Sequence, residues 1–273
     1  ELINFVAIEV LAPALMAFGT DEQLERWLPP MGPAERVWCQ LFSEPDAGSD
    51  LASLRTKAEP CEGGWKINGA KVWSTWAQFA HTGLILARTG PADSRHRGIS
   101  AFVIDMDQPG VQVHPLATMT GAAEFAEVLF DDAFVREEDL VGEVDKGWAV
   151  TLHILENERG PYALRRAAVL GSGMARVREM AAKRSLTPAQ RLRIADAEIS
   201  MRLLEHRARA VARLLVDEAP LGMESPMTKV ALTAAEQTVF AVAHELLGMD
   251  GTAWEGEEPE AVGLYLYSRA ASI

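Results

Sequence analysis

The sequence contains few cysteines and histidines. It has two cysteines, Cys39 and Cys61, and six histidines among 273 residues. The cysteines do not have the spacing of a metal site, and we expect reduced thiols in a cytoplasmic protein, with a disulfide as the less favoured alternative. Because the histidines are scattered without a metal-binding motif, we expect no metal site.

Long apolar runs and an excess of basic residues are also missing. No apolar run approaches the length of a membrane span, and no charged segment is followed by an apolar one as in a leader peptide. We therefore expect neither a membrane span nor a leader peptide. A net charge of −13 opposes binding to nucleic acid or to an anionic membrane surface. The net charge does not exclude the binding of a small anionic ligand, because local basic residues can override it.

The pattern of apolar residues divides the chain into three regions. Residues 1–36 have helical spacing, with Thr20 placed as the N-cap of a short second helix. Residues 37–142 contain short β-type segments bounded by turn formers, which is typical of a small barrel or sandwich. Residues 143–273 return to helical spacing and predict a bundle, in which Thr187-Pro188 starts one helix. An apolar stripe on that helix comprises Leu192, Ala195, Ile199, Leu203, Ala210 and Leu214.

The stretch from Trp38 to Leu51 predicts a short strand followed by a tight loop. Pro45 ends the strand because it has no N–H group, and Gly48 permits a sharp turn. Ala47, Gly48 and Ser49 offer backbone N–H groups and a hydroxyl that can surround an anion. An ordinary β-turn is the alternative interpretation.

A second stretch contains Asn68-Gly69 between two β-rich arms, which predicts a hairpin turn. The second arm ends in Trp73-Ser74-Thr75, a large aromatic side chain followed by two hydroxyls. A buried flavin ring needs an aromatic wall and hydrogen-bond donors at its polar rim, and this set supplies both. For Trp73 alone, packing in the core is the alternative.

Together these motifs, Ser43-Glu-Pro-Asp-Ala-Gly-Ser-Asp50 and Asn68-Gly-Ala-Lys-Val-Trp-Ser-Thr75, resemble the acyl-CoA dehydrogenase family. The resemblance continues through residues 97–105, 119–128 and 155–160 in the family's order and covers essentially the whole chain. It implies an α+β fold in three domains: a partial N-terminal helical domain (1–36), a central β-barrel domain (37–142) and a C-terminal four-helix bundle (143–273). Family members have more helices before this start and a loop after this end, so we expect a truncated chain.

The resemblance implies an FAD-dependent enzyme that dehydrogenates an acyl-CoA thioester between its α and β carbons. A carboxylate takes the α-proton, and flavin N5 takes the hydride. It also implies an electron-transfer flavoprotein as electron acceptor and a homo- or heterotetramer built as a dimer of dimers. The alternatives are an acyl-CoA oxidase that uses O₂ and a non-catalytic subunit of a heteromeric dehydrogenase.

For the flavin, the resemblance assigns Phe42 and Ser43 to the pyrimidine edge and Ser49, beside Gly48, to the pyrophosphate. It places Trp73 against the ring and Thr75 near N5. Ser49 is also assigned to the substrate.

In this family a glycine-rich turn of the neighbouring subunit also reaches the dinucleotide. Its counterpart here contains Gly248 and Gly251, and a helix C-cap is the alternative for Gly248. The family's arginine motif is not recognisable in residues 183–188. We therefore expect a divergent or heteromeric bacterial branch.

The catalytic base of this family lies either in a C-terminal loop or on a bundle helix immediately before an arginine. Residues 268–273 resemble the segment just before that loop, whereas Glu158-Arg159 matches the helix position. Glu158 is therefore the candidate base and Arg159 a candidate substrate contact, with Glu156 as the nearby rival and a solvated surface role as the alternative. The apolar run at residues 148–155 predicts a buried helix.

Overall fold

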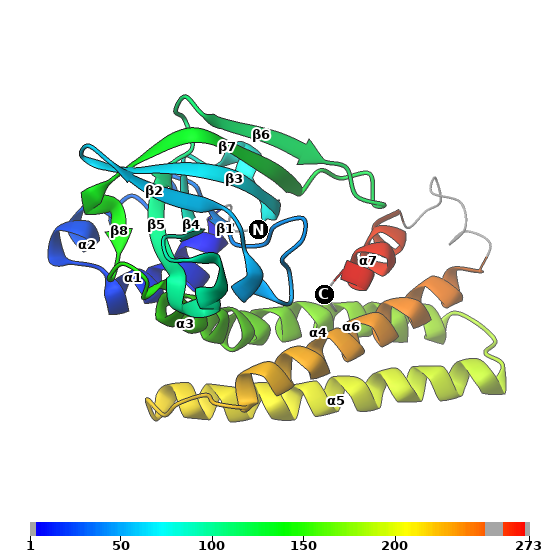
Figure 1. Ribbon diagram of the computed structural model, residues 1–273. Coiled ribbons are helices and arrows are strands. Elements are labelled where there is room, and N and C mark those ends of the chain that lie inside the picture. Colours follow the sequence, from blue (N-terminus) through cyan, green and yellow to red (C-terminus); the bar gives the residue numbers. More distant parts are fainter. Residues whose placement is uncertain (1–3, 249–258, 271–273) are drawn as a thin grey trace. The chain divides into compact units, whose positions relative to one another are not determined.

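The structure is a computed structural model that describes residues 4–248 and 259–270. The chain forms two compact units, Glu1–Asn157 and Glu158–Ile273. Helix α3 (Gly147–Arg159) ends the first unit and enters the second (Figure 1). None of the helices in the described ranges has the length and apolar character that a membrane crossing requires. The division at residues 36 and 142 stays a prediction.

The first unit begins with the helices η1 (Val6–Leu11), α1 (Ala12–Phe18) and α2 (Asp21–Trp27). Thr20 is the N-cap of α2, as predicted. Its hydroxyl accepts the Gln23 N–H at 3.3 Å, and the Gln23 side chain accepts the Thr20 N–H at 3.0 Å. The same glutamine side chain donates to the carbonyl oxygens of Glu138 and Leu140. A local cap thus also attaches α2 to the end of the β-region.

The β-region forms one mixed sheet in the order β6-β7-β3-β2-β4-β5-β8, with β1 paired parallel to β4 (Figure 1). The α+β class is confirmed, but β6 and β8 at the two ends do not pair, so the sheet is open and "barrel" was too strict a prediction. Residues 38–141, all of them described, contain short 3-10 turns and no α-helix. The strands are β1 (Trp38–Leu41), β2 (Lys57–Cys61), β3 (Gly64–Thr75), β4 (Thr82–Arg88), β5 (Ile99–Asp105), β6 (Val111–Leu116), β7 (Phe125–Arg136) and β8 (Leu140–Val141).

Strand β4 is buried on both faces, which is why its sequence is almost wholly apolar. Leu84 and Leu86 belong to a core cluster shared with the N-terminal helices and α3. Ile85 and Ala87 point to the other face, into a cluster shared with β3 and β7. The sheet therefore curls over its own core on one face, while helices cover the other.

The predicted hairpin turn at Asn68-Gly69 is wrong, because β3 continues through both residues. The chain reverses earlier, between Cys61 and Gly64. Asn68 instead bridges to Asp132 of β7: its amide nitrogen donates to the Asp132 carboxylate, and its amide oxygen accepts the Asp132 N–H, both at 2.9 Å. Gly69 has a φ of +149°, and its backbone lies close to Thr56: an added Cβ would be 2.5 Å from the Thr56 hydroxyl.

The second unit is a bundle of α4 (Pro161–Ala182), α5 (Pro188–Val216), α6 (Glu224–Leu247) and α7 (Pro259–Ala270) (Figure 1). Helix α6 contacts the other three, and α4 also contacts α5. Thr187 caps α5 through Gln190, and Pro188 occupies the first turn, as predicted. The predicted four-helix bundle is confirmed.

Helix α5 has apolar residues on two faces. Ala197, Met201 and Leu204 are buried in the bundle core, and Val211 is buried as well. The predicted stripe lies partly on another face, where Leu192, Ile199 and Leu203 are 68%, 64% and 55% exposed. An apolar strip of this kind on a long helix is typical of a surface that contacts another protein.

Gly69→Ala should destabilise the first unit by about 1–3 kcal/mol, because the new methyl group would overlap Thr56. Urea unfolding measures the change. Gly32→Ala is the control, since nothing lies within 4 Å of its added Cβ, and it should change stability by less than about 0.5 kcal/mol. Equal effects of the two substitutions would contradict the close approach at Gly69.

Candidate functional site

The first motif is a loop that begins at the end of β1. Phe42 is buried and Ser43 is half-buried. A turn then joins Glu44 to Ala47 through two backbone hydrogen bonds of 2.9 and 3.1 Å. Gly48 and Ser49 follow on the exposed side of the loop. The loop thus presents two of the three predicted small residues, Gly48 and Ser49, whereas Ala47 is buried and its N–H donates to the Glu44 carbonyl oxygen.

The second motif contains a β-bulge in β3. Lys71 pairs with Val128 and Ser74 with Ala126, so Val72 and Trp73 together face the single residue Glu127 of β7. A bulge changes the direction of the side chains that follow it. Lys71 and Ser74 are consequently both buried, although strict alternation would place them on opposite faces.

Trp73 occupies the bulge in a strained and exposed position. Its φ of +61° lies in the left-handed region, which bulky side chains rarely adopt. The side chain is 60% exposed, and its ring contacts Phe125 edge to face at 5.9 Å. Thr75 pairs with the same Phe125 and is half-buried. The packing alternative for Trp73 is therefore disfavoured, and an aromatic face is available beside a hydroxyl.

The two motifs lie side by side. The Val72 N–H donates to the Ser43 carbonyl oxygen at 2.9 Å. The Lys71 ammonium donates to the Phe42 carbonyl oxygen at 3.0 Å and to the Glu44 carboxylate at 2.9 Å. The structure thus brings Phe42 and Ser43 next to the bulge that carries Trp73. Their contacts with a flavin stay predictions.

Glu44 and Lys71 are residues to which the sequence analysis assigned no role. Lys71 is fully buried, and the Glu44 side chain is 7% exposed. Besides Lys71, the carboxylate accepts the N–H groups of Arg55 at 2.6 Å and Thr56 at 2.9 Å. One signal was available: Lys71 follows Ile67 by four residues in the strand, which places both on the same buried face and calls for an acidic partner.

The environment of this pair shifts both pKa values. Burial raises the pKa of Glu44, but Lys71 and the donors of Thr56 and Arg55 outweigh that effect, so the pKa lies below its ordinary 4.5. Burial lowers the pKa of Lys71 to about 8, and Glu44 opposes this shift. Both groups are therefore charged at neutral pH.

The second unit contains the other predicted residues. Glu158 is half-buried near the end of α3, and Arg159 is exposed. Burial lowers the pKa of Lys229 on α6, while the charges of Glu158 and Glu236 oppose that shift, so Glu158 lies within electrostatic reach of Lys229. Arg166 of α4 forms a largely buried ion pair with Glu236. The roles of Glu158 and Arg159 stay predictions.

Gly248 ends α6 with φ +63°, and its N–H donates to the Glu245 carbonyl oxygen. It thus serves as the helix C-cap that the sequence left as an alternative, while its approach to a phosphate stays a prediction. Gly251 lies outside the described residues.

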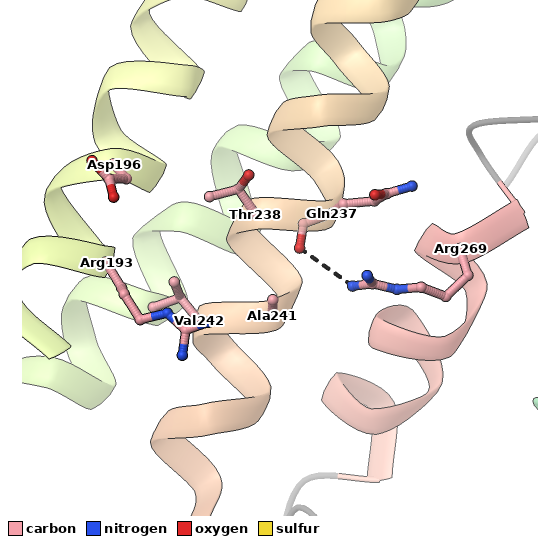
Figure 2. A pocket seen from close by; sticks show the side chains of 7 residues that line it. All are labelled: Arg193, Asp196, Gln237, Thr238, Ala241, Val242 and Arg269. Atoms are coloured by element: carbon pink, nitrogen blue, oxygen red, sulfur yellow. Dashed lines mark hydrogen bonds between the residues drawn. The ribbon is translucent and has the colours of Figure 1, made fainter. Parts of the chain in front are cut away.

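A hollow of about 270 Å³ in the second unit contains none of the predicted site residues. Figure 2 shows it between α5, α6 and α7, with Arg269 donating to the Gln237 carbonyl oxygen at 3.4 Å. Its charges are mixed, and Arg193 is paired with Glu245. The lining residues are Arg193, Asp196, Gln237, Thr238, Ala241, Val242 and Arg269.

Comparison with known proteins decides the family. The protein-family model of the acyl-CoA dehydrogenase middle domain matches residues 39–133, and the family model of the C-terminal domain matches residues 145–273. The acyl-CoA dehydrogenase IpdE1 of Mycobacterium tuberculosis is 36% identical over the whole chain, which spans 71% of that protein. This chain belongs to the acyl-CoA dehydrogenase family. The resemblance inferred from the two motifs is confirmed, and the chain is an oxidoreductase of a flavoprotein family.

Solved structures share the fold of this chain. The ChsE4–ChsE5 complex of Mycobacterium tuberculosis contains a chain with a TM-score of 0.86 and 26% identity, covering 98% of this chain and 72% of that one. The Tcur3481–Tcur3483 steroid ACAD, as its G363A variant, gives a TM-score of 0.86 at 25% identity, covering 98% and 71%.

Glu44→Gln should destabilise the acyl-CoA dehydrogenase fold by about 3–5 kcal/mol at neutral pH, because it leaves the Lys71 charge unpaired in the core. The pKa of Glu44 is depressed on folding, so its stabilisation is complete above the ordinary value of 4.5 and is lost as pH falls through the lower folded value. Urea unfolding between pH 7 and pH 3 should show the difference between wild type and variant shrinking below about pH 4.5.

Asp46→Asn is the matched control, because its carboxylate lies in the same turn but is 79% exposed. The substitution should change the free energy of unfolding by less than about 1 kcal/mol at every pH between 7 and 3. A Glu44→Gln effect that is the same at pH 3 and pH 7 would contradict the assignment.

Proposed function

We propose that this chain is an FAD-dependent acyl-CoA dehydrogenase that oxidises an acyl-CoA thioester between its α and β carbons. The exposed Trp73 is the observation that carries the proposal. A tryptophan in a left-handed bulge costs conformational energy, and such strain is concentrated at functional sites. A flat aromatic ligand with a polar rim would cover the indole and meet the nearby hydroxyls of Ser43 and Thr75.

FAD fits the first unit because the exposed aromatic face and the donors lie on adjacent segments. Bound FAD supplies the acceptor for the hydride that leaves the β carbon. Trp73 would cover the ring, and Ser43 and Thr75 would donate to its polar atoms. Gly48 and Ser49 would let backbone N–H groups approach the phosphates. The residues proposed to hold FAD are Phe42, Ser43, Gly48, Ser49, Trp73 and Thr75, with Gly248 and Gly251 reaching the FAD of a partner subunit.

Glu158 is the proposed general base. An α-proton beside a thioester is weakly acidic, so a carboxylate must be held close to it and partly shielded from water. Glu158 is half-buried, and the basic residue Lys229 lies within its electrostatic reach. The exposed Arg159, next in sequence, would contact the acyl-CoA together with Ser49.

The proposed assembly is a homo- or heterotetramer that transfers electrons to an electron-transfer flavoprotein. The exposed apolar strip of α5, comprising Leu192, Ile199 and Leu203, supports assembly because water would otherwise cover it. A heteromer is supported by the ChsE4–ChsE5 complex among the structural neighbours. The steroid ACAD neighbour supports a long or bulky acyl group.

Glu158→Gln tests the function, because glutamine keeps the size of the side chain and removes its basicity. The variant should retain FAD, while acyl-CoA reduces its flavin ~10²–10⁴ times more slowly, which is the usual contribution of a positioned base. Stopped-flow bleaching of the flavin with acyl-CoAs of graded size measures this rate. Glu156→Gln is the control and should keep most of the rate. Full-rate bleaching in the Glu158 variant would contradict the assignment of Glu158 as the base.

Thr75→Val tests the flavin contact with a side chain of nearly the same shape. The variant should bind FAD with a shifted reduction potential and slower reduction, because a donor to the ring has been removed. Ser74→Ala is the control, since the buried Ser74 hydroxyl has no hydrogen-bond partner among the described residues. Wild-type potential and spectrum in the Thr75 variant would remove Thr75 from the site.

A further inference from the structure

We propose that Lys71 and Glu44 are positioning residues that hold and polarise the flavin-binding surface of this chain. The inference rests on the proposed function and adds two residues that do not touch the flavin themselves. Their ion pair joins the Phe42–Ser43 segment to the bulge of Trp73 through contacts inside the first unit.

Glu44 anchors the loop. Its carboxylate accepts three donors: the Lys71 ammonium, the Arg55 N–H and the Thr56 N–H, at 2.9, 2.6 and 2.9 Å. These donors come from β3 and from the segment that leads into β2. The turn that follows Ser43 is therefore held from two sides.

Lys71 determines the orientation of the peptide between Phe42 and Ser43. Its buried ammonium donates to the Phe42 carbonyl oxygen at 3.0 Å. A trans peptide is planar, with its C=O and N–H pointing in opposite directions, and the described chain has no cis peptide. The Ser43 N–H therefore points away from the buried ammonium. A hydrogen bond from a cation polarises this peptide, so the Ser43 N–H becomes a stronger donor.

The same lysine stabilises the bulge. Lys71 lies two residues before Trp73, and the Val72 N–H between them donates to the Ser43 carbonyl oxygen at 2.9 Å. A left-handed tryptophan persists only where its surroundings determine its conformation. The buried charge on one side and the Ser43 contact on the other provide that constraint.

Stability alone does not require an ion pair here. Apolar residues of similar volume often replace a buried ion pair without loss of stability, whereas removal of one partner is strongly destabilising. The double variant Lys71→Met/Glu44→Gln removes both charges together. It separates the role of the pair in folding from its role at the flavin.

The experiment compares wild type, the double variant and Lys66→Met, with FAD added to each apo chain. Lys66 is the matched control, because it lies on the same strand in an exposed ion pair with Asp132. The double variant should unfold near the wild-type temperature, yet bind FAD about tenfold more weakly, the equivalent of one lost hydrogen bond. Its bound flavin should have a more negative reduction potential and an altered absorption envelope. Lys66→Met should match wild type in all four measurements.

A double variant that binds FAD with wild-type affinity, spectrum and potential overturns the inference. A double variant that does not fold assigns the pair to folding and also overturns it. Wild-type chain that binds no FAD overturns the proposed function, and the inference with it, so the two failures are distinguishable.

Discussion

The charge of Lys71 lies where water does not reach, and this constraint shapes the surface on which the proposed cofactor would rest. A buried ammonium needs acceptors from the protein itself. Here they are the Phe42 carbonyl oxygen and the Glu44 carboxylate. Because the first is backbone and the second lies in a turn, satisfying the charge also fixes the path of the chain. The loop after β1 and the bulge of β3 are thereby held together.

The sheet provides the rigid support for this arrangement. Its central strands β4 and β5 are buried on both faces, between helices on one side and the curled half of the sheet on the other. Strand β1 pairs with β4, and β3 pairs with β2 and β7, so the two motifs enter the site from firmly packed strands. Loops supported in this way position binding groups better than loops between exposed elements do.

Charges are also buried in the helical unit, around the candidate base. Arg166 and Glu236 pair between α4 and α6, and Lys229 lies within electrostatic reach of Glu158 and Glu236. The apolar run at residues 148–155 of α3 predicted a buried helix. Val150 and Ile154 are buried, but Leu152 is 53% exposed. The surroundings of Glu158 are therefore more polar than its sequence neighbours indicated.

Features that depend on neighbouring residues or on a family pattern could be predicted from the sequence. Thr20 and Thr187 cap helices as predicted, because each cap closes within three residues. The two motifs were sufficient to identify the family. Other features depend on contacts between distant residues: β3 passes straight through Asn68-Gly69 because Asp132 pairs with Asn68 from 64 residues away. Lys71 meets Glu44 across 27 residues, and the bulge that exposes Trp73 exists only in the pairing of β3 with β7. Local pattern cannot show such contacts, since they depend on which strands become neighbours in the folded sheet.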